Sequence, residues 1–136
     1  MQAIPYLNFN GNCREAFSFY EQCFGGKIVA MFTHGETPAG EHCPGDWQEL
    51  IMHARLTFDG GVLMASDAPP DRYEKPQGIW VSLHPETPAE AERIFHALAE
   101  GGDVMMPIQK TFWAERFGMV TDRFGIPWMV NCEAAG

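Results

Sequence analysis

The sequence contains a small set of side chains that could transfer protons or hold an anion. His53 opens an expected strand and is the best-placed histidine for acid–base work near neutral pH. Asp67 and Glu115 are the carboxylates that would share this work. Arg116 stands on an expected strand among aromatic residues, where its planar guanidinium suits a carboxylate, phosphonate or phosphate. The alternative for Arg116 is an ion pair with Glu115 or Asp122.

A second set of side chains could line a cavity for a small molecule. Alternation along a strand places Tyr6 and Asn8 on one face, and Met64 and Ser66 on one face of another strand. Tryptophan and methionine side chains add aromatic and polarisable surface, although for the tryptophans the core is the favoured interpretation. The candidate ligand-binding residues are Tyr6, Asn8, Met64, Ser66, Trp80, Trp113, Arg116 and Met129.

Other kinds of reactive site find little support in the sequence. No Gly-x-Ser-x-Gly segment occurs, and Ser66-Asp67 has no histidine placed beside it by the sequence. His34, His42 and Cys43 lie in or beside a Gly/Pro-rich loop and could in principle catch a metal, but isolated loop histidines are more often exposed polar residues. We therefore expect neither a nucleophilic enzyme nor a loop metal site.

The cysteines and the charge balance narrow the class of protein. The cysteines form no CxxC pair, so we expect reduced thiols and a cytoplasmic location. The net charge is −9, from nine basic and eighteen acidic residues, and no basic run occurs, which argues against nucleic acid as a partner. No segment approaches the roughly 20 apolar residues needed to cross a bilayer, so no membrane partner is expected. The cysteines are Cys13, Cys23, Cys43 and Cys132.

Two helices are the firmest elements that the sequence predicts. Asn12, with Glu15 three residues later, predicts an N-cap, and Gly25-Gly26 predicts the helix end. Thr87-Pro88 begins the second helix, and Gly101-Gly102 ends it. The apolar positions that recur at helical spacing are 13, 16, 17, 20, 23 and 24 in the first helix and 91, 94, 95 and 98 in the second.

The remaining segments predict strands in the same order around each helix. The expected strands are 4–10, 27–32, 53–58, 62–66, 79–83, 104–111, 116–121 and 126–131. A β-α-β-β-β unit therefore occurs twice, and neither copy could bury its sheet face alone. In this comparison Leu7 corresponds to Leu83, and Gly61 and Gly125 open matching hairpin strands. The sequence predicts one α+β domain over 1–136, with modules at about 3–68 and 79–132, a linker at 69–78, and two sheets that curve around a cleft.

The chain resembles the PhnB-like branch of the vicinal oxygen chelate superfamily, also called glyoxalase/bleomycin-resistance/dioxygenase. The resemblance extends over nearly the whole chain and lies in residues 5–9, 16–21, 24–26, 63–67, 91–95, 110–118 and 122–129. It implies two βαβββ modules, a homodimer, and one of many functions, from glyoxalase, dioxygenase and epimerase to metal-free antibiotic sequestration. Some relatives carry a ubiquinone-pathway methyltransferase label, but the sequence has no Gly-rich nucleotide loop between strand and helix.

The resemblance also implies where a metal would bind. Metal-dependent members place His and Glu ligands on the first and fourth strands of each module. Alignment puts Pro5, Met64, Ile79 and Met129 at those positions, and a shift of one residue brings Tyr6, Ala65, Trp80 and Trp128. Neither set suits Ni²⁺, Zn²⁺ or Fe²⁺, so we expect no metal and no cofactor.

Three functional hypotheses remain open from the sequence. The first is a binding protein for an unknown small molecule, with an apolar, aromatic cleft. The second is a lyase, isomerase or oxygenase that uses His53, Asp67, Glu115 and Arg116. The third is an accessory protein of phosphonate metabolism, which only the family's name and its frequent operon company suggest.

Overall fold

The computed structural model describes residues 1–41, 44–69 and 71–133. The chain divides into two compact units, Met1–Glu74 and Lys75–Gly136. Within these described residues, each unit contains one α-helix and one four-stranded sheet. The division falls within the predicted linker 69–78, whose described residues contain no helix and no strand.

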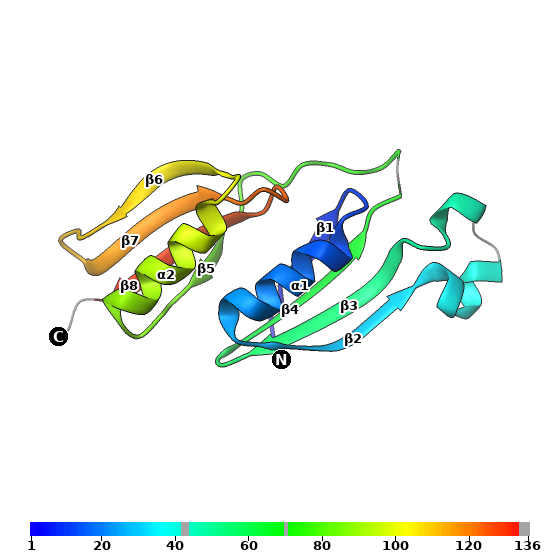
Figure 1. Ribbon diagram of the computed structural model, residues 1–136, viewed down its shortest axis with the longest axis horizontal. Coiled ribbons are helices and arrows are strands. Elements are labelled where there is room, and N and C mark those ends of the chain that lie inside the picture. Colours follow the sequence, from blue (N-terminus) through cyan, green and yellow to red (C-terminus); the bar gives the residue numbers. More distant parts are fainter. Residues whose placement is uncertain (42–43, 70, 134–136) are drawn as a thin grey trace. The chain divides into compact units, whose positions relative to one another are not determined.

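The first unit has the order β-α-β-β-β that the sequence predicts (Figure 1). Its strands are arranged β1-β4-β3-β2, with β1 parallel to β4 and the other neighbours antiparallel. Short 3-10 helices at His34–Glu36, Pro38–Glu41 and Gly45–Trp47 occupy the expected Gly/Pro loop. The main elements are β1 (Tyr6–Phe9), α1 (Cys13–Phe24), β2 (Lys27–Thr33), β3 (Ile51–Phe58) and β4 (Gly61–Asp67).

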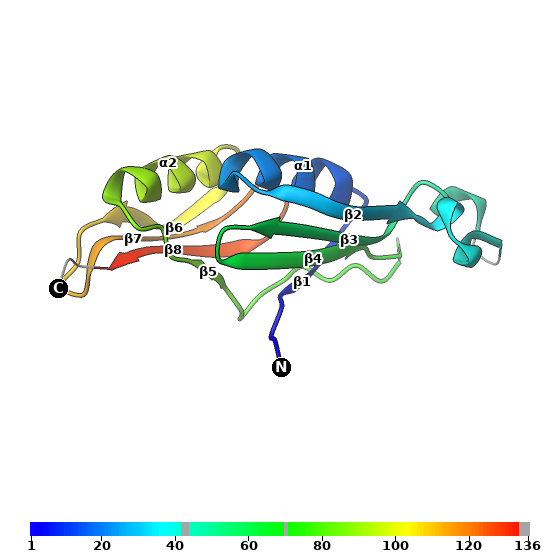
Figure 2. The same ribbon diagram turned by 90° about the horizontal axis from the view of Figure 1, so that it is seen from below.

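The helix α1 covers one face of the first sheet, because its apolar stripe is buried there (Figure 2). Phe9 of β1 contacts Phe17 and Tyr20 of α1, and all three side chains are fully buried. The rings of Phe9 and Phe17 meet edge to face, a contact that adds to the stabilisation from apolar burial. The helix ends at Gly25 in the left-handed conformation, with φ of 66°, as predicted.

The start of α1 differs from the sequence-based expectation. The Asn12 side chain makes no capping hydrogen bond, and its Oδ1 is buried without a partner in the described part of the chain. Instead, the backbone N–H of Cys13 donates to Oδ1 of Asp67, over 2.9 Å. A residue 54 positions away therefore supplies the cap, which a local sequence pattern cannot reveal.

The second unit repeats this arrangement with its own helix and sheet. Its strands are arranged β5-β8-β7-β6, again with one parallel pair, β5 and β8. The side chain of Thr87 caps α2 by accepting from the backbone N–H of Glu90, as predicted. The elements are β5 (Val81–Leu83), α2 (Pro88–Ala99), β6 (Asp103–Gln109), β7 (Ala114–Thr121) and β8 (Pro127–Glu133).

The two sheets can be aligned residue by residue from their strand pairs. Tyr6 pairs with Met64 in the first sheet, and Ser82 pairs with Met129 in the second. This alignment matches Gly60 with Gly125, which both have positive φ, at 80° and 92°. The sequence-based match of Gly61 with Gly125 was therefore wrong by one residue, because the second hairpin has one residue more in its turn.

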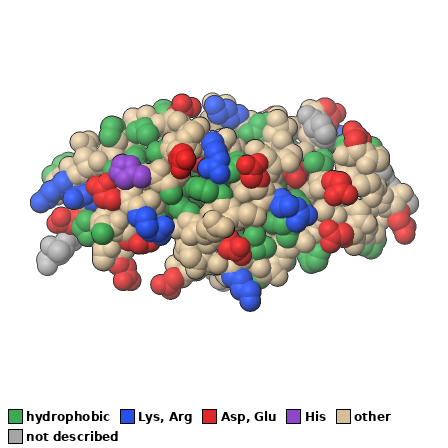
Figure 3. All heavy atoms as spheres, viewed as in Figure 1, with side chains coloured by type: hydrophobic (Ala, Val, Ile, Leu, Met, Phe, Trp, Pro, Cys, Tyr) green, Lys and Arg blue, Asp and Glu red, His purple; other side chains and the backbone are tan. Residues whose placement is uncertain are grey.

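The surface carries charges of both signs. Figure 3, in the same view as Figure 1, shows acidic and basic side chains interspersed on that face of the molecule. Among the described residues, no helix has the length and apolar character that crossing a membrane would require.

Candidate functional site

The face of the first sheet opposite α1 brings together most of the residues predicted to bind a ligand. Leu7, Leu63, Ala65 and Leu56 alternate toward the helix and are buried, so their neighbours in each strand point the other way. We call this other side the open face of the first sheet. It carries Tyr6, Asn8, Phe32, His53, Arg55, Met64 and Ser66.

Tyr6 and His53 form a pair at the centre of the candidate site. The Tyr6 hydroxyl and His53 Nδ1 share a hydrogen bond of 3.2 Å. Their rings are stacked, with centroids 5.9 Å apart and planes 26° from parallel. Because Tyr6 comes from β1 and His53 from β3, the tyrosine side chain must reach across β4. The pair places a proton-carrying group on a side chain that is 49% exposed, where a ligand can contact it.

Two weaker polar contacts flank this pair. The Ser66 hydroxyl donates to Asn8 Oδ1 over 3.3 Å, which links β4 to β1. Nη1 of Arg55 approaches the thioether sulfur of Met64 at 3.9 Å, and a thioether is a weak acceptor. The sequence-based search missed Arg55, although the signal was present: it lies two residues after His53 and so shares its face of the strand.

Asp67 lies at the end of β4 but on the helix side of the sheet. Its carboxylate is 5% exposed and accepts two backbone N–H groups, from Cys13 over 2.9 Å and from Ile51 over 2.9 Å. These bonds join the start of α1 to the start of β3. The geometry gives Asp67 a structural role at the start of α1 and β3, and its acid–base role stays a prediction.

The thiol of Cys13 lies in the same buried region. Burial raises the pKa of Cys13 far above its usual value, and the nearby Asp67 charge adds to this effect. The thiol therefore remains protonated and poorly nucleophilic. Cys13, Cys23 and Cys132 are buried, whereas Cys43 and His42 lie outside the described residues.

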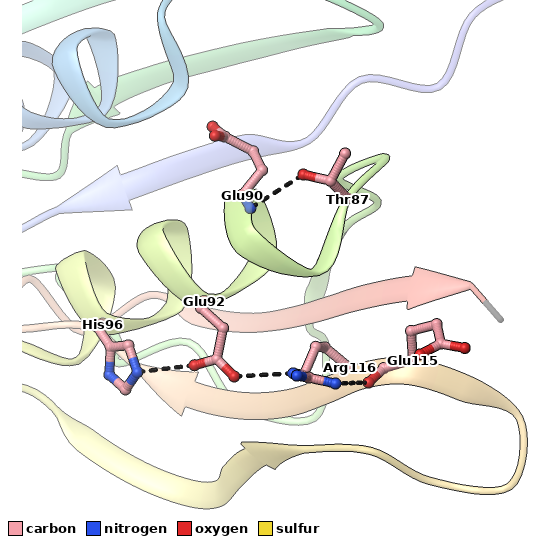
Figure 4. Close-up of polar contacts among 6 residues, drawn as sticks. All are labelled: Thr87, Glu90, Glu92, His96, Glu115 and Arg116. Atoms are coloured by element: carbon pink, nitrogen blue, oxygen red, sulfur yellow. Dashed lines mark hydrogen bonds and ion pairs between the residues drawn. The ribbon is translucent and has the colours of Figure 1, made fainter. Parts of the chain in front are cut away.

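The other predicted site residues belong to the second unit. Arg116 does not bind the carboxylate of Glu115 or Asp122: its Nε donates to Oε1 of Glu92 on α2 over 2.9 Å, and its Nη1 donates to the backbone carbonyl of Glu115 (Figure 4). Because Glu92 lies on α2, Arg116 points toward the helix side of the sheet. The carboxylate of Glu92 also contacts Nε2 of His96 at 3.0 Å.

The aromatic candidates of the second unit lie in different surroundings. Trp113 is 46% exposed and contacts the rings of Phe112 and Phe117. Trp80 lies just before β5 and is half-buried. Met129 is half-buried between Ser82 and Met119, its neighbours across the strands. Trp128, by contrast, is fully buried and donates to Asp122, so it belongs to the core.

The residues at the ligand positions implied by the resemblance do not fit a metal site. The strand pairs place Tyr6 beside Met64 and Ser82 beside Met129, whereas Pro5 and Ile79 lie just outside the strands. A phenol, a hydroxyl and two thioethers are a poor donor set for Ni²⁺, Zn²⁺ or Fe²⁺. Among the residues that the structure describes, no three His, Cys, Asp or Glu side chains are grouped so that they could hold a metal ion.

Comparison with known proteins gives the family. The family model described as "3-demethylubiquinone-9 3-methyltransferase" matches residues 1–131. The chain is 37% identical to Protein YjdN of Escherichia coli (strain K12), over 96% of this chain and 95% of that protein. The chain belongs to this PhnB-like family, within the glyoxalase/bleomycin-resistance, or vicinal oxygen chelate, superfamily.

Solved structures agree with this assignment. Protein PA1353 from Pseudomonas aeruginosa is 56% identical, with a TM-score of 0.90 and 98% of each chain covered. A putative 3-demethylubiquinone-9 3-methyltransferase, PhnB protein, from Bacillus cereus is 25% identical, with a TM-score of 0.82, and the match covers 97% of this chain and 99% of that one. The fosfomycin resistance protein FosX from Mesorhizobium loti shares the fold alone, at 8% identity and a TM-score of 0.64, with 99% of this chain and 93% of that chain covered.

Proposed function

We propose that this chain binds a small organic molecule on the open face of the first sheet. The observation that carries the proposal is the Tyr6–His53 pair, a hydrogen-bonded and stacked couple on an accessible sheet face. An exposed tyrosine held in one orientation by a partner offers both an apolar ring and a polar handle. Met64 and Phe32 supply apolar surface beside it, and Phe32 is 45% exposed.

The composition of this face supports binding of an organic ligand. A small-molecule site is usually mostly apolar, with a few polar groups that orient the ligand. The open face has this mixture: two aromatic residues and a methionine stand among His53, Arg55, Asn8 and Ser66. The hydrogen bond between Ser66 and Asn8 holds both side chains in place, so they can present a fixed hydrogen-bonding edge to a ligand.

A fragment titration followed by NMR tests the proposal. A mixed set of neutral, cationic and anionic aromatic fragments is added to the full chain, and backbone amide shifts are recorded. We expect binders to perturb residues of β1, β3 and β4 together, and Tyr6→Ala to weaken them. The matched control is Phe112→Ala, because Phe112 is 96% exposed but lies in the second unit. The proposal would be refuted if Tyr6→Ala left the amide shifts and the affinities of the binders unchanged. It would also be refuted if no fragment bound.

A second candidate function is catalysis on the same face. The Tyr6–His53 hydrogen bond favours it, because a tyrosine next to a histidine can pass a proton to a bound substrate. The test is product formation from any ligand that binds this face. Turnover that is lost in both Tyr6→Phe and His53→Gln, with binding retained, would favour an enzyme over a binding protein.

The family description does not lead us to propose methyl transfer. Methyltransferases that use S-adenosylmethionine on a nucleotide-binding fold hold it with a Gly-rich turn between a strand and a helix. Here β1 is joined to α1 by Asn10-Gly11-Asn12, which contains a single glycine.

A further inference from the structure

We infer that the ligand of the open face is a small organic anion and that Arg55 binds its negatively charged group. The inference rests on the proposed function, because it concerns the same face, and it adds the chemical class of the ligand. Arg55 has no role in the folding contacts described above other than its weak contact with Met64.

The guanidinium of Arg55 lacks an acidic partner. Among the described residues, no carboxylate lies within ion-pair distance of it. Nη1 of Arg55 contacts the sulfur of Met64 at 3.9 Å. This weak contact satisfies little of the hydrogen-bonding capacity of the five N–H donors of the guanidinium. Arg55 is nevertheless half-buried on β3, an internal strand between β2 and β4. A partly desolvated cation without a counter-charge favours an anion from solution.

The strands around Arg55 are unusually poor in acidic residues. The chain has eighteen Asp and Glu residues, yet the strands β1 to β4, all of them described, contain only Asp67. Asp67 faces α1, and its two oxygens accept from Cys13 and Ile51. The open face therefore carries the guanidinium of Arg55 and presents no carboxylate from its own strands. Such a local excess of positive charge on an otherwise acidic protein indicates an anionic ligand.

The neighbours of Arg55 suggest the rest of the ligand. Met64 pairs with both Arg55 and Tyr6 across the sheet, and His53 lies on the same face of β3. An anionic group at Arg55 would thus lie beside Met64, with Tyr6 on the other side of Met64 and His53 two residues away on the same strand as Arg55. A carboxylate, phosphonate or phosphate joined to an apolar or aromatic body satisfies both regions at once.

The second unit supplies an internal contrast. Arg116 is also a strand arginine, but Glu92 neutralises it at 2.9 Å. Substituting Arg116 should therefore leave anion binding unchanged, which makes it a matched control of the same residue type. The side chains of Arg55 and Arg116 are both only half-buried, so neither arginine belongs to the buried core.

Paired probes of equal shape test the inference. Benzoate and phenylphosphonate carry a negative charge, and benzamide is the neutral isostere of benzoate. Each is titrated into the full chain, and dissociation constants are taken from shifts of the Arg55 Nε–H and of backbone amides in β3 and β4. We expect both anions to bind more tightly than benzamide, and Arg55→Gln to weaken them about tenfold or more. Arg116→Gln should change them less than about twofold.

The outcomes separate this inference from the proposed function. If benzamide perturbs the same face as strongly as benzoate, or if Arg55→Gln binds both anions unchanged, the ligand is not selected by charge and only the present inference fails. If no probe perturbs the open face up to its solubility limit, and the fragment titration finds no binder, both fail. An amide spectrum of Arg55→Gln that matches the parent outside β3 and β4 confirms that the variant is folded.

Discussion

The two units share a fold but differ in the side chains that their sheets leave uncovered. Across the first sheet, one row of paired residues reads Tyr6, Met64, Arg55 and Ala30. The corresponding row of the second sheet reads Ser82, Met129, Met119 and Met106. The first row contains a phenol and a guanidinium, whereas the second consists of a hydroxyl and three thioethers.

The helix side of the two sheets is more alike. Each unit has a buried aspartate, although at a different place: Asp67 ends β4 and is 5% exposed, and Asp122 lies in the turn between β7 and β8 and is 4% exposed. Each accepts backbone N–H groups, and Oδ2 of Asp122 also accepts from Nε1 of Trp128. The comparison teaches that the packed side preserves the fold in both units, while the opposite side is free to differ and can carry specificity.

The largest expected effect concerns this shared, packed side. Asp67→Ala leaves the N–H groups of Cys13 and Ile51 without their acceptor and should lower the free energy of unfolding by about 3 kcal/mol. Asp122→Ala should cost a similar amount, since it removes the acceptor of Phe124, Ile126 and Trp128. Urea denaturation measures both. The exposed Asp71 is the control, and Asp71→Ala should stay within about 0.5 kcal/mol.

A smaller effect is expected when the first sheet is made to resemble the second. Arg55→Met gives the first row the residue type found at Met119, and it should reduce benzoate affinity by about 1.4 kcal/mol, or tenfold. Unfolding should be changed little, because Arg55 makes no ion pair in the described part of the chain. Calorimetry of benzoate binding, with urea denaturation of the same sample, measures both quantities. Unchanged benzoate affinity in Arg55→Met would contradict the proposal that Arg55 gives the first sheet an anion-binding ability that the second sheet lacks.

The ion pair between Arg116 and Glu92 should have a still smaller effect, which concerns the free energy of unfolding. Glu92→Gln removes the charge that holds Arg116 and His96, but the side chains of Glu92 and Arg116 are 37% and 32% exposed. Solvent screens such pairs, so the loss of stability should not exceed about 1 kcal/mol. Freed Arg116 lies on the helix side, and we expect no gain in benzoate binding. A gain as large as the loss in Arg55→Met would show that the two faces are equivalent.

The smallest effect at neutral pH is expected from the thiol of Cys13, the first residue of α1. The first residue of α2 is Pro88, which has no titratable side chain. Burial raises the pKa of the folded Cys13 thiol above its unfolded value, so the unfolded chain loses this proton at a lower pH than the folded one. The stabilising contribution is complete below the ordinary cysteine pKa of 9.0 and is lost as pH rises above it. Urea denaturation between neutral and alkaline pH should show this decline in the parent, and a shallower decline in Cys13→Ala. Identical slopes would contradict the buried, protonated thiol.

Much of the fold could be predicted because it depends on short-range patterns. Both helices, their buried stripes and the Thr87 cap are confirmed, since helical periodicity and capping act within a few residues. The resemblance to the glyoxalase-like family is likewise confirmed by the family match and the strand topology. The predicted homodimer, the cytoplasmic location and the choice between binding and catalysis remain predictions.

The candidate site was only partly predictable. Alternation correctly placed Tyr6 and Asn8 on one face of β1, and Met64 and Ser66 on the matching face of β4. It could not show that Tyr6 reaches His53 across β4, because strand order is a long-range property. Nor could it show that Arg116 pairs with Glu92 rather than with Glu115 or Asp122.

The amino-acid sequence by itself determined which segments form helices and strands, that α1 ends at Gly25, and that the pattern occurs twice. Those properties arise from backbone preferences and periodicity among near neighbours. Only the tertiary structure decided that Asp67 caps a helix 54 residues away, that Glu92 neutralises Arg116, and that Arg55 has no such acid among the described residues. The fate of a charge depends on which side chains the folded chain brings within a few ångströms, and sequence spacing does not specify that distance.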